Sequence, residues 1–439
     1  MSPRTRELIY LVLVGIAVAA AYSTMYIAQS KVLNYQSLGW GAAFFALLLV
    51  AHLATRRFVP LGDPYLLPAA GLLCGLGVTE IQRLTPDLSG RQTAWLVIGM
   101  VAFIVVLAGL RDHHVLERYQ YLIGAGGVLA LIITVSPLGH EVNGSRLWIN
   151  FGPVNIQPGE FAKLAIVIFL AGYLAANREV LGRGVSLRHL GPVALFWGAS
   201  LALLVLMNDF GTSLLFYGTF LLMLYVATAR AWYLGAGGLA FAAGSYFVYH
   251  TAAHVHQRFD IWLDPFKDEH GAGYQLVQGL FALADGGLFG RGLGQAFLVT
   301  ANGNTLIPDA QTDFIFAALA DELGWVGAVG VLLIYVVVAW RGYAIAAQAQ
   351  DGFSKLLAFG LATTFALQSL IIVGGVVRLL PLTGQTLPFV SYGGSSVLAN
   401  FLLIGILLVI SHNTYAAPAL RARADLRAQG EADRQAAHR

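Results

Sequence analysis

Two aspartates, Asp309 and Asp313, lie where a long polar stretch runs into an apolar one, within residues 302–324. Carboxylates four residues apart share one face of a helix, and the positive end of the helix dipole would lie beside them. The spacing therefore predicts a site of concentrated negative charge at the start of an apolar helix.

A second pair of charged residues, Glu160 and Lys163, opens another apolar stretch. Residues three apart occupy one helix face, so they form either an ion pair that anchors a helix end or part of a functional site. Ionisable residues inside a membrane are candidates for function, and both interpretations stay open. Asp209, in a short turn between two apolar stretches, is predicted to cap a helix and, secondarily, to shape the site.

The segment from Tyr249 to Asn304 carries glycines at 286–294 but lacks the Gly-Lys-Ser/Thr of a nucleotide-binding loop. Tight packing of short helices explains these glycines better. Arg258 and Lys267 in the same segment can contact anions, because guanidinium groups bind phosphates in a bidentate way.

Residues 378–396 combine two prolines, three glycines and several hydroxyl groups. Irregular backbone at membrane depth is tolerated where it is buried in protein or lines a wet cavity, so this segment predicts a binding cavity. No His/Cys cluster indicates zinc, and the spacing shows no Ser/His/Asp triad.

The elements that position these residues are membrane helices. The 439 residues are 57% hydrophobic and 11% charged, with a mean hydropathy of +0.70, and this composition predicts an integral membrane protein with no nucleic-acid partner. A helix needs about 20 apolar residues to cross the hydrocarbon core. By that criterion we expect an all-α protein with twelve spans, near residues 7–28, 38–54, 64–81, 92–110, 121–138, 158–177, 191–207, 210–228, 231–249, 313–345, 355–376 and 394–412.

The 313–345 stretch is too long for one straight span, so we expect a break near Gly324 or Gly327. The single cysteine, Cys74, excludes an intramolecular disulfide. Seventeen Lys and Arg residues fall on the side of the two termini and nine on the other side. The positive-inside rule then places both termini in the cytoplasm and the loops 139–157, 250–312 and 377–393 outside. Residues 416–439 are expected to be a solvated or frayed cytoplasmic tail.

These polar segments resemble the motifs of one family, the shape, elongation, division and sporulation (SEDS) proteins, whose members include RodA and FtsW. The resemblance runs from about Asp63 to Ser411. It is carried by Trp148-Ile-Asn-Phe-Gly-Pro with Gln157-Pro-Gly-Glu-Phe-Ala-Lys, Asp209-Phe-Gly-Thr, Asp264-Pro, Gly271-Ala-Gly-Tyr-Gln, Thr312-Asp-Phe-Ile-Phe-Ala with Glu322-Leu-Gly, and Pro381-Leu-Thr-Gly through Ser396.

The resemblance implies a ten-span core over residues 61–415, preceded by two extra transmembrane helices in residues 1–60. It also implies a peptidoglycan glycosyltransferase of the bacterial cytoplasmic membrane, acting in elongation or division. Such an enzyme polymerises lipid II, an undecaprenyl-diphosphate disaccharide-pentapeptide, together with a class B penicillin-binding protein transpeptidase.

The same resemblance places the family's essential aspartate at Asp313, which would act as the general base of an inverting transfer. Arg146, Lys163 and Arg258 would stabilise the departing diphosphate. Glu160 is expected to orient Lys163, Trp148 to pack on a sugar or lipid, and Asp309 to hold a divalent cation (Mg or Mn) or position the acceptor. Hydroxyl groups expected to bind substrate are those of Thr312, Thr383, Ser391 and Ser395.

The chain departs from the family pattern at four positions, with Gln311 for a His, Asp309 for a Glu, Asn208 for a Pro and Gly159 for a Ser. The missing His removes one group that could orient Asp313. Two other classes remain compatible with the sequence: a flippase or transporter of lipid II, and a non-catalytic scaffold of the divisome or elongasome.

Overall fold

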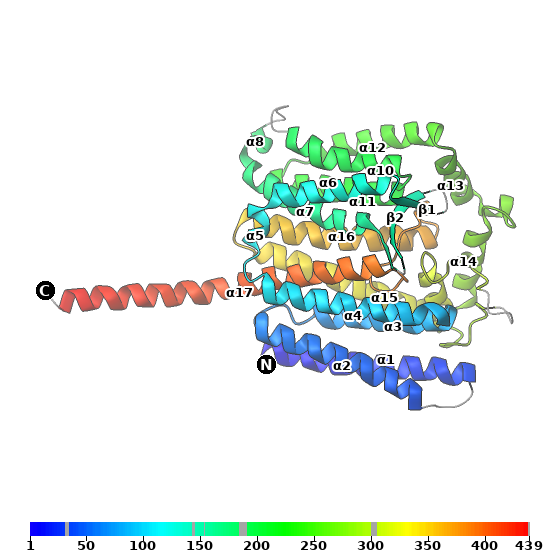
Figure 1. Ribbon diagram of the computed structural model, residues 1–439, viewed down its shortest axis with the longest axis horizontal. Coiled ribbons are helices and arrows are strands. Elements are labelled where there is room, and N and C mark those ends of the chain that lie inside the picture. The colour runs from blue at the N-terminus through cyan, green and yellow to red at the C-terminus, as the bar shows by residue number, and fades with distance from the viewer. Residues whose placement is uncertain (31–34, 143–144, 153, 184–190, 300–304, 438–439) are drawn as a thin grey trace.

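The computed structural model describes residues 1–30, 35–142, 145–152, 154–183, 191–299 and 305–437, and its long helices lie side by side in one bundle (Figure 1). Eight of the described helices are long and apolar enough to cross a membrane. This confirms an all-α polytopic membrane fold. The eight are α1 (Pro3–Ser30), α2 (Tyr35–Phe58), α4 (Pro86–Gly109), α7 (Pro158–Ala176), α11 (Phe210–Thr228), α15 (Ile315–Gln348), α16 (Gly352–Val376) and α17 (Gly394–Ala437).

The other four predicted spans are also helical, but they are shorter or less apolar. They are α3 (Leu66–Leu84), α6 (Gln120–Val135), α10 (Ala199–Leu206), which follows a π-helical turn at Ala194–Gly198, and α12 (Trp232–Thr251). The total of twelve spans therefore stays a prediction. Short helices complete the described chain: α5 (His114–Arg118), α8 (Arg178–Arg183), α13 (Ala253–Leu263), the 3₁₀ turn Pro265–Asp268 and α14 (Tyr274–Asp285).

Figure 1 shows both chain ends at one end of the bundle, and α13, α14 and the strands at the other. Helix α17 continues past the bundle as a single helix to Ala437, where the sequence predicted a solvated or frayed tail; the helix is not frayed. The Ala, Arg and Gln residues that dominate residues 419–437 are strong helix formers, which accounts for the difference.

The predicted break in α15 lies at Gly324, whose φ of 70° and ψ of −177° are not helical. The glycine-rich segment 286–292 packs against α15 at this break. Its carbonyl groups at Gly287 and Leu288 accept from the N–H groups of Trp325 (2.9 Å) and Val326 (3.1 Å). In return, the N–H groups of Arg291 and Gly292 each donate over 3.0 Å to carbonyls of the first part of α15. The backbone groups freed by the break are thus satisfied.

A small antiparallel sheet departs from the purely helical prediction. Its strands β1 (Gly139–Val142), β2 (Ser145–Phe151) and β3 (Val154–Ile156) pair in the order β1-β2-β3. Trp148 lies opposite His140 in this sheet. The strands are too short to produce a clear alternating pattern within a polar loop.

The two N-terminal helices are joined to each other by a buried polar cluster around Glu7. Its carboxylate accepts from the Thr55 hydroxyl (2.6 Å), contacts His52 Nδ1 (2.7 Å) and pairs with Arg4. Close helix contact fixes α1 against α3, because a Cβ added at Gly75 would lie 2.2 Å from Val18. Small residues commonly permit such contacts in membranes.

Candidate active site

A cavity of about 230 Å³ opens beside Asp313, at the end of the bundle that carries α13 and α14. Its walls come from α13, α14, the turn before α15, the end of α16 and the irregular segment 377–393. The lining residues are Gln257, Arg258, Ile261, Trp262, Ala272, Gln275, Leu276, Asp313, Phe314, Ile372, Leu382, Thr383, Gly384 and Gln385.

Asp313 lies in a hydrogen-bonded turn. The four-residue spacing had predicted that it shares a helix face with Asp309, and this is wrong. Asp309 has a positive φ of 51°, which breaks helical geometry, and α15 begins only at Ile315. The Asp313 N–H donates to the carbonyl oxygen of Asp309 over 3.1 Å. The two carboxylates still act on each other: burial and then the charge of Asp309 raise the pKa of Asp313 to about 7, with Arg258 opposing the rise.

Arg258 lies across from Asp313, with Gly384 between them. The Arg258 Nη1 donates to the carbonyl oxygens of Leu382 and Thr383, each over 3.4 Å. A Cβ added at Gly384, where φ is +67°, would lie 3.5 Å from Asp313 Oδ2 and 3.8 Å from Arg258 Nη2. A carboxylate and a guanidinium therefore face one small space, which suits proton removal beside a developing anion.

The predicted substrate-binding hydroxyls divide into two groups. Thr383 lines the cavity, whereas Ser391 and Ser395 are buried and form hydrogen bonds with backbone groups. Ser391 Oγ donates to the Thr312 carbonyl and accepts from the Leu387 N–H (2.9 Å), and Ser395 Oγ accepts from the Gln157 N–H (2.9 Å). Thr312 Oγ1 donates to the Asp309 carbonyl over 2.9 Å. Ser391 and Thr312 thus stabilise the turn and the loop around Asp313, whereas Ser395 joins α17 to the start of α7.

Glu160 and Lys163 form the predicted ion pair, at 2.5 Å. Lys163 is buried and also donates to Gln368 Oε1 over 2.7 Å, while Gln368 Nε2 donates to the Thr386 carbonyl over 3.0 Å. The pair therefore connects α7 to the loop that carries Gly384, without lining the cavity. A role of Lys163 toward substrate stays a prediction.

Arg146 and Trp148 lie on β2, outside the cavity lining. Arg146 is about half exposed and lies 3.7 Å from Glu141 on β1. The sheet that carries both residues packs beside α6 and α7. Their predicted contacts with substrate are not tested by this arrangement.

Asp209 caps α11 as predicted, because its carboxylate accepts from the Thr212 N–H over 2.9 Å. Thr212 in turn accepts from Gln385 Nε2 over 2.7 Å, and a Cβ at Gly211 would lie 2.9 Å from Thr383. The capped turn thus supports the Gly384 loop from behind.

Some cavity residues were not singled out from the sequence. Trp262 donates from Nε1 to the Arg378 carbonyl (3.1 Å), and Arg378 Nε donates back to the Trp262 carbonyl (2.8 Å), so they join α13 to the loop. Gln275 donates to the Pro308 carbonyl over 2.8 Å. Gln275 ends the Gly271-Ala-Gly-Tyr-Gln motif, which was the available signal, whereas Trp262 had none. Arg378 does not line the cavity, and it begins the segment 378–396 that the sequence did single out.

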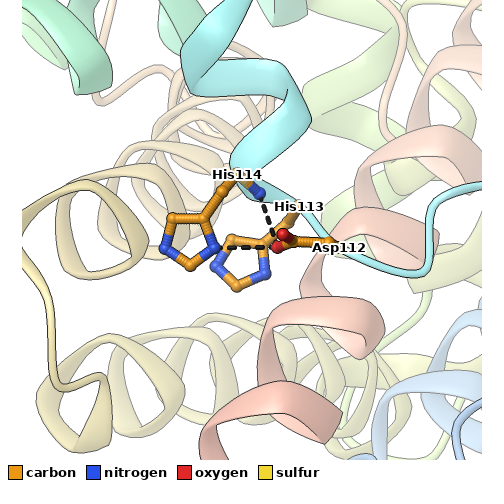
Figure 2. A group of neighbouring side chains, drawn as sticks. All are labelled: Asp112, His113 and His114. Carbon is orange, nitrogen blue, oxygen red and sulfur yellow. Dashed lines mark hydrogen bonds and ion pairs between the residues drawn. The ribbon is translucent and has the colours of Figure 1, made fainter.

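The one group of three potential metal ligands found among the described residues lies elsewhere, at Asp112, His113 and His114 (Figure 2). The Asn413 amide donates to His113 Nδ1 (3.1 Å), and His113 Nε2 bonds Ser354 Oγ (2.5 Å). Burial lowers the pKa of His113 to about 4. Both nitrogens of this neutral ring are therefore occupied, and the cluster joins the turn after α4 to α16 and α17.

The fold and the cavity define a polytopic membrane protein with a candidate site at one end of its helix bundle. The chain belongs to the FtsW, RodA and SpoVE family, whose family model, described as "Cell cycle protein", matches residues 79–416. This confirms the resemblance to the SEDS proteins.

Several relatives and solved structures are similar over most of the chain. "Peptidoglycan glycosyltransferase RodA" of Mycobacterium leprae is 42% identical over 93% of this chain and 90% of its own. "Stage V sporulation protein E" of Bacillus subtilis is 36% identical over 73% and 86%. A structure published as "Structural coordination of polymerization and crosslinking by a peptidoglycan synthase complex" matches with a TM-score of 0.68, at 27% identity over 81% of this chain and 98% of that one. The Thermus thermophilus rod-shape-determining protein RodA matches with a TM-score of 0.57, at 26% identity and the same coverage.

The alignment with the mycobacterial relative leaves only about 31 residues of this chain outside it, as 7% of 439. It therefore includes part of residues 1–60, whereas the family model begins at residue 79 and leaves them outside, as the resemblance implied.

Proposed function

We propose that this chain is a peptidoglycan glycosyltransferase that polymerises lipid II, with Asp313 as general base. The observation that carries the proposal is the meeting of Asp313 and Arg258 across Gly384 in one cavity. The relatives named peptidoglycan glycosyltransferase support the same class of reaction.

In the proposed step, the acceptor hydroxyl loses its proton to the Asp313 carboxylate while its oxygen attacks the anomeric carbon of the donor. The bond from that carbon to the diphosphate breaks, and its electron pair leaves with undecaprenyl diphosphate. Attack on the face opposite the leaving group inverts the anomeric centre. A base with a pKa of about 7 is well matched to this proton transfer, and Arg258 can stabilise the departing charge.

The positive-inside distribution supports placing both termini in the cytoplasm and the cavity at the outer face of the cytoplasmic membrane. The cavity and the termini lie at opposite ends of the bundle, in agreement with this orientation. A class B penicillin-binding protein transpeptidase is the proposed partner, which the similarity to a peptidoglycan synthase complex supports.

A divalent cation, Mg²⁺ or Mn²⁺, fits the exposed Asp309 carboxylate beside Asp313. Mg²⁺ is commonly bound by one or two carboxylates together with water and substrate phosphates. We propose Asp309 as its protein ligand, and the ion would neutralise charge on the diphosphate.

The proposal is tested by lipid II polymerisation with the purified full chain and its transpeptidase partner, whose own activity is blocked. Asp313→Asn is expected to lower the rate about 10²–10⁴-fold while lipid II binding is kept. Asp260→Asn is the matched control, because Asp260 is an exposed carboxylate on α13 that does not line the cavity. Equal activity of wild type and Asp313→Asn would remove Asp313 from the mechanism. No polymer from either would favour the flippase hypothesis, to be tested by a bilayer-flipping assay.

A further inference from the structure

A second hollow, of about 300 Å³, lies between the two N-terminal helices and the pair α3 and α4. We call it the N-terminal crevice. It is lined by Val18, Tyr22, Trp40, Gly41, Ala43, Phe44, Ala46, Leu47, Val50, Gly75, Val78, Thr79, Thr93, Leu96 and Val97. None of these residues lines the Asp313 cavity, so the crevice is a separate site among the residues the structure describes.

The chemistry of the crevice is that of a hydrocarbon. Of its three hydroxyl groups, two are used within their own helices: Thr79 donates to the Gly75 carbonyl (2.8 Å) and Thr93 to the Ser89 carbonyl (2.9 Å). The third belongs to Tyr22, whose side chain is buried. At its mouth, Val50 and Val97 are 51% and 43% exposed in the middle of apolar helices, so it opens sideways toward lipid. Apart from the Tyr22 hydroxyl and the Trp40 indole N–H, its side chains offer a polar ligand no partner.

The length of the crevice matches one leaflet of a bilayer. From Trp40 to Val50 the α2 helix rises about 15 Å, and half of a hydrocarbon core about 30 Å thick is the same length. Most of the lining residues come from the halves of the four helices that lie away from the chain termini, and Leu47 and Val50 reach past the midpoint of α2. Trp40 lies near the first residues of α2, and aromatic side chains near the ends of membrane helices mark the headgroup level.

Helices α3 and α4 separate the crevice from the irregular segment 377–393, which carries Thr383 and Gly384 of the Asp313 cavity. On their opposite faces, Gly77 approaches Val390 so closely that a Cβ would lie 2.4 Å from its carbonyl oxygen. Gln92 donates to the Ser391 carbonyl over 3.3 Å and accepts from the Gly393 N–H over 3.2 Å. A lipid whose headgroup occupied the Asp313 cavity would therefore have this two-helix wall between its headgroup and the crevice.

We propose that the N-terminal crevice binds one fatty acyl chain of a membrane phospholipid, in the leaflet opposite the chain termini. The acyl chain packs against the wall formed by α3 and α4, which also supports the loop of residues 387–393. A phospholipid lies in hydrocarbon whether it is free or bound, so its acyl chain is held by close packing and not by the hydrophobic effect. The proposal does not depend on the proposed enzymatic function.

The test uses the full chain in phosphatidylglycerol and phosphatidylethanolamine vesicles that contain a phospholipid with a diazirine in its acyl chain. After illumination, mass spectrometry should find labelled peptides concentrated in residues 40–50 and 93–97. Ala43→Trp, which fills the crevice from an exposed position of α2, should reduce this labelling about tenfold, equivalent to about 1.4 kcal/mol.

Leu239→Trp is the matched control, because Leu239 is 74% exposed on α12, far from the crevice lining, and crevice labelling should persist in it. If Ala43→Trp does not fold, Val97→Trp fills the same space from α4. Labelling no stronger than that of α12, or unchanged in a folded filled variant, would overturn the proposal. So would labelling by a diazirine polyprenyl diphosphate in place of the phospholipid, which would assign the crevice to the substrate tail.

Discussion

The ionisation of Asp313 gives the proposed reaction a pH dependence that can be measured. A general base acts in its ionised form, and the pKa of Asp313 is raised to about 7. About a tenth of the carboxyl groups are then ionised at pH 6 and about nine tenths at pH 8, so the rate of the chemical step should rise about tenfold across this interval. An aspartate with an ordinary pKa would give a flat profile there.

The variant Asp309→Asn tests the physical cause. Without a divalent cation, Asp309 contributes to the raised pKa through its like charge, so in the presence of a chelator its removal should lower the pKa of Asp313 and move the midpoint of the profile to lower pH. A cation bound at Asp309 would already neutralise that charge, so the comparison is made without one. The midpoint is the readout, and not the maximum rate, because Asp309 is also our proposed cation ligand.

The assay is single-turnover polymerisation of lipid II between pH 5.5 and pH 9, with the partner transpeptidase blocked. Single turnover keeps product release out of the measured rate. A rate that is constant between pH 6 and pH 8, or a midpoint that does not move in Asp309→Asn with a chelator present, would refute the role of Asp313 as a base with a raised pKa.

Three further outcomes follow from the same structure. Arg258→Gln should lower the polymerisation rate about 10²-fold. It should also move the midpoint of the rate–pH profile to higher pH, because Arg258 lowers the pKa of Asp313. Arg230→Gln, at an exposed position of the α11–α12 turn, should change neither the rate nor the midpoint. Gly324→Ala should destabilise the protein by about 1–3 kcal/mol in thermal unfolding. The backbone conformation of Gly324 is nearly restricted to glycine, and the added Cβ would lie 2.2 Å from Gly290 N. Gly330→Ala is the control and should show no loss of stability, because its Cβ would meet nothing within 4 Å. Lys163→Met should cost about 3–5 kcal/mol by leaving Glu160 buried and unpaired, and adding Glu160→Gln should restore much of the thermal stability; no recovery in the double variant would contradict a structural role of the pair.

Much of this architecture could be predicted from the sequence because hydrophobic length and charge spacing act locally. Apolar stretches located the long helices, the three-residue spacing of Glu160 and Lys163 gave their ion pair, and the length of 313–345 gave the break at Gly324. The Asp209 cap was equally local. The motifs of the family pointed to Asp313, and the anion-binding chemistry of a guanidinium pointed to Arg258.

The features that the sequence did not predict depend on contacts between residues far apart in the chain, which a local sequence pattern does not reveal. The positive φ of Asp309 takes Asp313 off the helix, and this angle is set by how the turn packs against the loop. Ser391 and Ser395 resemble substrate-binding hydroxyls in the sequence, yet their partners are backbone groups far along the chain. The sheet that carries Arg146 was missed for the same reason, because strand pairing is non-local.

The break in α15 has a consequence for how the site is held. Backbone hydrogen bonds join residues 287–292 to residues 321–322 before the break and to residues 325–326 after it, so the glycine-rich loop braces both parts of α15 across Gly324. The short segment that follows Asp313 is thereby fixed relative to the long part of the helix. A substitution that disrupted residues 287–292 would loosen this brace and would therefore affect the position of Asp313, although the two lie in separate segments of the chain.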